Sequence, residues 1–147
     1  MNNELIATED ITLLGITITN TLSWAQHITG IAKKTAKSLY ILGRSSDLLP
    51  QQARITVYKD PKDIRPLMEY AAPIWSGAGT ASLALLDRLQ KRALRLLKID
   101  DPLDAGIVPL VHRRNVASLC VFYRHMFLQP SIELSEILPR KDRKSVV

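Results

Sequence analysis

The first regular pattern lies near the amino terminus and is typical of β-strands. Residues 11–19 read Ile-Thr-Leu-Leu-Gly-Ile-Thr-Ile-Thr, so branched and apolar residues partly alternate with threonine. Alternation of this kind favours a strand, and Gly15 interrupts it in the middle. The pattern therefore predicts a short strand, or a strand pair broken at Gly15, followed by a turn at Asn20.

The next segment has the period of an amphipathic helix. Mostly apolar residues recur there at intervals of three and four: Trp24, Ile28, Ile31, Thr35, Leu39 and Leu42. Residues at these intervals share one face of a helix, so we expect a helix from Ser23, acting as its N-cap, to about Gly43. The basic residues of this segment fall on another face: Lys33, Lys37 and Arg44.

Prolines divide the middle of the chain. Pro50 suits the first turn of a second helix. Pro61 would remove a backbone donor from the interior of that helix, at a cost of roughly 3 kcal/mol, so we expect a break near residues 59–63 and a resumption around Ile64. Two more prolines should make the resumed helix kinked or short: Pro66 and Pro73.

Two further helices are predicted in the second half. The third runs from about Ala81 to Ile99, with Thr80 or Ser82 as its cap. Its expected buried stripe is Leu86, Leu89, Ala93 and Leu96, and its basic side carries Arg88, Lys91, Arg92, Arg95 and Lys98. The fourth runs from about Val111 to Leu128. Its apolar stripe is Val116, Leu119, Cys120, Tyr123 and Phe127.

These elements predict a mainly α fold, in which a short N-terminal β-strand or hairpin is followed by a bundle of about four helices. The 147 residues are 46% hydrophobic, which suits one ordinary domain with a core. Trp24 and Trp75 lie beside apolar residues at helical spacing, so we expect both to anchor that core. No stretch approaches the roughly 20 apolar residues that span a bilayer, and the first thirty residues lack a secretory signal. We therefore expect an intracellular chain, nuclear or cytoplasmic, with no membrane partner.

Charge and cysteine content narrow the class of function. Twenty Lys and Arg oppose fourteen Asp and Glu, which gives a formal net charge of +6. Such an excess favours polyanionic partners such as nucleic acid or anionic lipid. The single cysteine, Cys120, excludes an internal disulfide and any zinc site built from several cysteines.

Enzyme motifs fail on inspection, so no catalytic, cofactor-binding or metal-binding residue is predicted in this chain. Residues 30–35 lack the glycine that precedes lysine in a phosphate-binding loop, and they lie inside a helical pattern. No two of the three histidines have the spacing that brings imidazoles to one metal ion. Asp100 and Asp101 precede Pro102 at a helix end, where a terminating turn explains them better than the paired metal ligands of a polymerase.

The basic helix faces are the remaining signal. No acidic residue interrupts the third helix between Arg88 and Ile99. A cationic face of this kind contacts a phosphate backbone by releasing counterions. The candidate contacts are Lys33, Lys37, Arg88, Lys91, Arg92 and Arg95. The alternative is a solvated outer face, because any exposed amphipathic helix carries charge on its outer side.

Taken in order, several segments resemble the region after the palm in reverse transcriptases of non-LTR retrotransposons, especially the RNA-directed DNA polymerase of jockey-like mobile elements. The resemblance spans about residues 11–139. The segments that carry it are Leu14 to Ile18, Leu22 to Trp24, His27-Ile28, Tyr58-Lys59, Ile64 to Pro66, Leu67 to Ala71, Pro73 to Ser76, Leu89 to Ala93, His112 to Arg114, Ala117 to Arg124, Glu133-Leu134 and Ile137 to Pro139.

This resemblance implies a thumb and post-thumb region that holds an RNA/DNA template-primer duplex. The turn at Leu14 and Gly15 would then be similar to the primer-gripping hairpin. It also implies that the fingers and the palm, with the metal-binding aspartates of the polymerase, are missing partners of this chain. No cofactor is expected here, although an intact parent enzyme would use Mg²⁺.

The resemblance divides the chain into four parts. Residues 1–22 would be a strand or hairpin remnant of the palm edge, 23–100 a thumb-like bundle, 101–139 a C-terminal helical extension, and 140–147 a disordered basic tail. The sequence departs from the family where Asp60-Pro61-Lys62-Asp63 fills a gap that usually holds about two residues. The alternative function is a free-standing basic helical module that binds nucleic acid or another partner and has no polymerase role.

Overall fold

A computed structural model describes residues 8–60 and 64–128 of the chain, and this part is mainly helical. An antiparallel hairpin of β1 (Asp10–Leu13) and β2 (Ile16–Thr19) comes first. The helices that follow are α1 (Ala25–Arg44), α2 (Gln51–Lys59), α3 (Ile64–Leu67), α4 (Ala72–Trp75), α5 (Thr80–Leu97) and α6 (Leu110–Tyr123), which continues as the π-helical turn η1 (Arg124–Leu128). The predicted fold class, a short hairpin followed by about four substantial helices, is confirmed.

The hairpin closes through a two-residue turn. Leu13 pairs with Ile16, which leaves only Leu14 and Gly15 in the loop. Both have positive φ, 49° for Leu14 and 79° for Gly15. The tightest hairpin turns require positive φ at both central positions, and glycine adopts it without steric cost. The interruption that Gly15 makes in the sequence pattern is therefore the turn between two strands.

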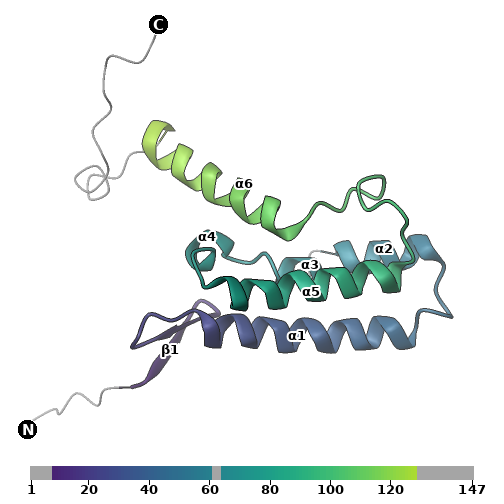
Figure 1. The fold of residues 1–147 in the computed structure, drawn as a ribbon, viewed down its shortest axis with the longest axis horizontal. Helices are drawn as coiled ribbons and strands as arrows, with labels where there is room; N and C mark the ends of the chain where they lie inside the picture. The colour runs from purple at the N-terminus through teal and green to yellow at the C-terminus, as the bar shows by residue number, and fades with distance from the viewer. Residues whose placement is uncertain (1–7, 61–63, 129–147) are drawn as a thin grey trace, which may run out of the picture.

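The two longest helices, α1 and α5, lie side by side and run in the same direction (Figure 1). The short helices α2, α3 and α4 return along one side of this pair (Figure 1). Near the carboxyl ends of α1 and α5, Gly43 meets Leu96. A Cβ on Gly43 would lie 3.5 Å from Leu96 Cδ2, an ordinary van der Waals distance, so the two helices are packed against each other at this point.

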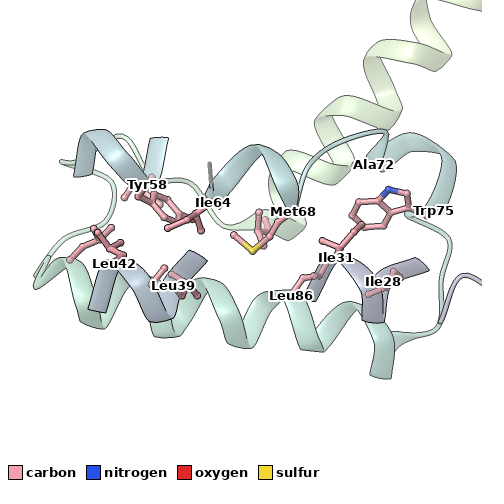
Figure 2. Close-up of a cluster of buried hydrophobic side chains, with 14 residues drawn as sticks. Ile28, Ile31, Leu39, Leu42, Tyr58, Ile64, Met68, Ala72, Trp75 and Leu86 are labelled. Atoms are coloured by element: carbon pink, nitrogen blue, oxygen red, sulfur yellow. The ribbon is translucent and has the colours of Figure 1, made fainter. Parts of the chain in front are cut away.

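The core lies between the α1–α5 pair and the three short helices. Figure 2 shows Ile28, Ile31, Leu39 and Leu42 of α1 facing a row of side chains that includes Tyr58, Ile64, Met68 and Trp75. Trp75 is fully buried, which agrees with its predicted role as a core anchor. Trp24 is partly buried against the same cluster. The face predicted for α1 is the one that is buried, Thr35 included.

Helix starts differ from the sequence expectations. Ser23 was expected to cap α1, but Trp24 occupies the cap position and makes no side-chain capping bond. The Ser23 hydroxyl still accepts a hydrogen bond from the Ala25 N–H at 3.4 Å. Gly79, rather than Thr80 or Ser82, is the N-cap of α5. These predictions were wrong by one to three residues, because propensity locates a helix end less sharply than tertiary packing does.

A buried amide on α5 was missed by the sequence pattern. The predicted stripe holds for Leu86 and Ala93, whereas Leu89 and Leu96 are only partly buried. Gln90 is buried in their place because its side chain binds backbone on both sides of Pro109. Its Nε2 donates to the Val108 carbonyl at 3.0 Å, and its Oε1 accepts from the Leu110 N–H at 2.9 Å. This amide fixes the start of α6.

Side chains of α2 donate hydrogen bonds to the backbone carbonyls at the carboxyl end of α5. Arg54 is buried, and its Nη1 donates to the Leu96 carbonyl at 2.9 Å. Gln51 Nε2 donates to the Lys98 carbonyl at 2.6 Å. The last carbonyls of a helix have no partner inside it, and cations near that end are favoured by the helix dipole. Arg54 therefore has a structural role.

The fourth predicted helix is present as α6 and η1, but its apolar stripe is not part of the core. The buried residues of α6 are Leu110 and Arg114. All five residues of the stripe are exposed: Val116, Leu119, Cys120, Tyr123 and Phe127. The interior of the bundle is already filled by α1, α5 and the three short helices, so the expectation that this stripe completes the bundle is wrong.

The proline break falls partly where placement is not described. α2 ends at Lys59 and α3 begins at Ile64, as expected, but Pro61 itself lies outside the described residues. The predicted tail, residues 140–147, and the end of the predicted extension also lie outside them. Among the helices that are described, none combines the length and apolar character needed to cross a bilayer.

Leu39 provides a test of the core. Its side chain is fully buried, so Leu39→Ala should lower the free energy of unfolding by about 2–5 kcal/mol, through lost burial and the cavity left behind. Leu48 is 85% exposed, so Leu48→Ala should change it by no more than about 0.5 kcal/mol. Urea unfolding followed by far-UV circular dichroism measures both. Equal effects of the two substitutions would contradict the assigned core.

A buried histidine holds the hairpin to the bundle. His27 is 5% exposed and packs edge-on against Trp24 and Trp75. Its Nδ1 accepts a hydrogen bond from the Thr17 N–H of β2 at 3.2 Å. A nitrogen that accepts carries no proton, so this contact requires the neutral ring. Burial lowers the pKa of His27 below its ordinary value of 6.5, and the charge of Lys34 lowers it further.

The lowered pKa makes stability depend on pH with a definite sign. Above pH 6.5 the ring is neutral in both the folded and unfolded chain, so its full contribution is present. Below 6.5 the unfolded chain takes up a proton first, so the free energy of unfolding should fall until the folded pKa is passed. Replacing His27 by Asn keeps an acceptor and removes the titration. Urea unfolding across this range should show a steeper acid loss in the wild type than in His27→Asn, and parallel curves would refute the assignment.

Candidate nucleic-acid interface

A groove of about 440 Å³ runs between α1 and α5. Its lining residues on each helix recur at intervals of three and four, so each helix contributes one continuous face. The α1 residues are Thr29, Ala32, Lys33 and Ala36, and the α5 residues are Leu85, Arg88, Leu89, Arg92 and Arg95. The fully buried core residues lie on another face of both helices, whereas Ala32 and Leu89 pack against the core and line the groove as well. The groove therefore borders the core along the α1–α5 seam.

The groove has an apolar floor and cationic edges. Small or aliphatic residues supply the floor, and none of the nine lining residues is acidic or aromatic. The four cations are Lys33, Arg88, Arg92 and Arg95. All four are exposed, and within residues 8–60 and 64–128 none forms an ion pair with a carboxylate. Arg88 Nε bonds only within its own helix, to the Ala84 carbonyl at 3.3 Å.

Other arginines of the domain are already engaged in structure. Arg113 Nη2 donates to Glu69 at 2.8 Å, and Arg65 lies 3.7 Å from the same carboxylate. Arg114 is 3% exposed and donates from Nη2 to both oxygens of Asp87, at 3.0 and 3.3 Å. A buried guanidinium paired in this way is not available to a ligand. These arginines are therefore held by carboxylates of the domain, whereas the four cations of the groove are exposed.

Four of the six predicted backbone contacts thus meet in one place. Lys37 lies one helical turn after Lys33 and is exposed, so it extends the same row of α1 beyond the groove lining. Lys91 is also exposed, but it is not among the residues that line the groove. The structure therefore gives Lys37 a flanking position and places Lys91 beside the groove.

The primer-grip-like turn is a separate feature. Leu14 is 80% exposed at the tip of the hairpin. Its carbonyl accepts a hydrogen bond from the Tyr70 hydroxyl at 2.9 Å, and a Cβ on Gly15 would lie 3.8 Å from the Tyr70 ring. The Trp75 indole N–H donates to the Tyr70 carbonyl at 2.9 Å. Tyr70 therefore links the turn to the core, and neither Leu14 nor Gly15 lines the groove.

Sequence reasoning found the cations but not the floor between them. Ala32, Ala36, Leu85 and Leu89 line the groove together. Their spacing on each helix was available as a signal, because both sets repeat at three and four residues. What the sequence did not contain was the pairing of α1 with α5, which turns two separate stripes into one surface.

Across the described ranges, no three His, Cys, Asp or Glu side chains are grouped closely enough to hold a metal ion. The groove instead offers cations above an aliphatic floor, an arrangement that suits phosphates and sugars.

The chain matches no protein-family model, no curated protein and no solved structure.

Proposed function

We propose that this chain is a fragment of a retrotransposon RNA-directed DNA polymerase, the thumb region that holds the template-primer duplex, without the catalytic palm. The observation that carries the proposal is the gathering of Lys33, Arg88, Arg92 and Arg95 along one groove, where no carboxylate of residues 8–60 or 64–128 pairs with them. The ordered segments between residues 11 and 139 that resemble such enzymes add the polymerase ancestry.

The spacing of the cations suits a nucleic-acid strand. Along an α-helix the rise is about 1.5 Å per residue, so Arg88, Arg92 and Arg95 span roughly 10 Å of the groove edge. Long, flexible guanidinium side chains on this edge reach successive phosphates of one strand, and each neutralised phosphate releases counterions. The floor of alanine and leucine lies beneath the strand, where it contacts sugar rings rather than base edges.

The composition of the groove favours a duplex over a single strand. Proteins that bind single strands without sequence preference stack bases on aromatic side chains. No aromatic residue lines this groove, so binding depends on backbone charge and on shape. Recognition of this kind fits a template-primer duplex, whose sequence changes as copying proceeds.

Catalysis is assigned to parts that this chain does not contain. We expect no polymerisation by this chain alone, because the metal-binding aspartates of such enzymes belong to the palm. The missing palm and fingers are accordingly its expected partners, and Mg²⁺ is the expected cofactor of the intact parent. An intracellular location, nuclear or cytoplasmic, follows from the same assignment.

A free-standing basic module that binds nucleic acid remains the second candidate. It is favoured by the completeness of the groove, whose nine lining residues all come from α1 and α5. The two functions differ in the ligand they prefer. Tighter binding to a duplex with a recessed primer end than to a blunt duplex of equal length supports the thumb, and equal binding supports the free-standing module.

The role of the groove is tested by the salt dependence of duplex binding. Replacing Arg88 and Arg92 together by Gln should reduce the slope of log affinity against log salt by up to about 0.9 for each lost phosphate contact. Fluorescence anisotropy with a labelled RNA/DNA duplex across a salt series measures this slope.

Lys34 and Lys98 supply the matched control. Both are exposed and neither lines the groove, so the double replacement by Gln removes the same charge from elsewhere on α1 and at the end of α5. We expect the control to keep nearly the whole wild-type slope. Equal slopes for the wild type and Arg88→Gln/Arg92→Gln would show that the groove does not contact the duplex. An equal loss of slope in this variant and in the control would show that only the total charge of the chain matters.

A further inference from the structure

The exposed apolar face of α6 and η1 is the largest feature that the proposed function leaves unused. Its residues lie three or four positions apart on one side of the helix, and we name them the α6 stripe: Val116, Leu119, Cys120, Tyr123 and Phe127. Leu119 is 65% exposed and Tyr123 55%. Phe122 and Leu128 flank the stripe and are also exposed.

Most of the α6 stripe lies beyond the part of α6 that contacts the bundle, and only Val116 also lines a described cavity beside Glu69 and Ala72. The first part of α6 is tied to the bundle by Arg113 to Glu69, by Arg114 to Asp87, and by the Ser118 hydroxyl to that of Ser76 at 3.1 Å. All three contacts lie in the first nine residues of the helix. Beyond them α6 diverges from α5, and its distal end stands clear of the other helices (Figure 1).

The apolar area of this face is the size of a stable interface. A fully exposed aromatic side chain presents about 150–250 Å², so the exposed fractions of the stripe and its two flanking residues correspond to roughly 700 Å² in total. The largest apolar patch on a typical monomer is about 300–600 Å². A standard protein interface buries about 800 Å² on each partner. The α6 stripe and its two flanking residues together therefore exceed the patch size that a monomer usually exposes, and they approach one half of an interface.

The charge distribution decides which kind of partner fits. From Val116 to Leu128 the only formally charged side chain is Arg124, and Asp and Glu are absent. A second copy of a chain with net charge +6 would be repelled at the cationic groove, but it meets almost no like charge at this face. An acidic partner would find little here to pair with.

We propose that the α6 stripe is a homodimer interface, in which the same face of a second copy packs against it about a twofold axis. A self-complementary surface of this kind gives the closed symmetry that most soluble oligomers have. The helices pack antiparallel, so that the centres of the two stripes meet near Cys120. Tyr123 and Phe127 already stack with ring centroids 4.8 Å apart, which presents a flat aromatic surface for that packing.

The dimer leaves the groove open. The α6 stripe lies on a helix that packs against α4 and α5, whereas the groove lies along the α1–α5 seam. A dimer would therefore carry two grooves and hold two duplexes, or two parts of one. Self-association and duplex binding are separate properties of the chain, and either one can be absent without the other.

The mass of the full chain in solution is the first test. Sedimentation velocity with reductant present should give twice the chain mass at micromolar concentration. Leu119→Glu places a charge in the middle of the stripe at an exposed position, so the chain stays folded while self-association weakens by about tenfold or more. Leu48→Glu makes the same chemical change at a residue that is 85% exposed outside the stripe, and it should leave the dimer unchanged.

The single cysteine supplies an independent test. Cys120 is exposed in the α6 stripe, and neighbouring packed helices lie about 8–10 Å apart, so a short bismaleimide should join two chains through this thiol. The same reagent should give little product with Leu119→Glu. Full cross-linking of the wild type and of Leu48→Glu, with loss only in Leu119→Glu, confirms the interface.

Three results would overturn the proposal. The first is a wild type that stays monomeric across the micromolar range. The second is a monomer that co-sediments with vesicles of anionic phospholipid and loses this binding in Leu119→Glu, which assigns the face to a lipid surface. The third is a monomeric full chain that dimerises only after residues 129–147 are removed, which assigns the face to the chain's own following segment.

Discussion

The parallel packing of α1 against α5 is the contact on which the rest of the domain depends. Each helix divides its surface between two uses. One face of the pair closes the core with α2, α3 and α4, and another face forms the groove with its exposed cations. The two helices are in contact as far as Gly43 and Leu96, near their carboxyl ends. Changing how the two helices pack would therefore alter the core and the groove together.

Buried polar groups determine the positions of helix ends and loops, which the apolar core does not determine. Hydrophobic burial is not directional, so it does not determine where a loop ends or at what point a helix starts. Gln90 does so for α6 by binding backbone on both sides of Pro109, and Arg54 does so for the carboxyl end of α5. His27 joins the hairpin to α1 in the same way. Each of these contacts is long-range in sequence and directional in space.

The sequence predicted the elements better than it predicted their contacts. The hairpin, the buried face of α1 and the core role of Trp75 followed from periodicity, because one amphipathic face suffices to define them. The buried Gln90 could not follow, since its burial depends on a loop twenty residues away. The exposure of the α6 stripe could not follow either, because periodicity shows that a face is apolar and does not show whether the core has room for it. For the groove, the cations were predictable, but the shared floor required the pairing of two helices.

The hairpin turn contains a residue whose backbone conformation lowers the stability of the folded domain. Leu14 holds a left-handed backbone conformation, which costs an L-residue with a side chain roughly 1–2 kcal/mol. Asparagine or glycine at this position would relieve much of that strain. The same change would remove an apolar side chain that is 80% exposed and lies beside exposed Leu13. Relieving the backbone strain at this residue would therefore also make the end of the hairpin less apolar.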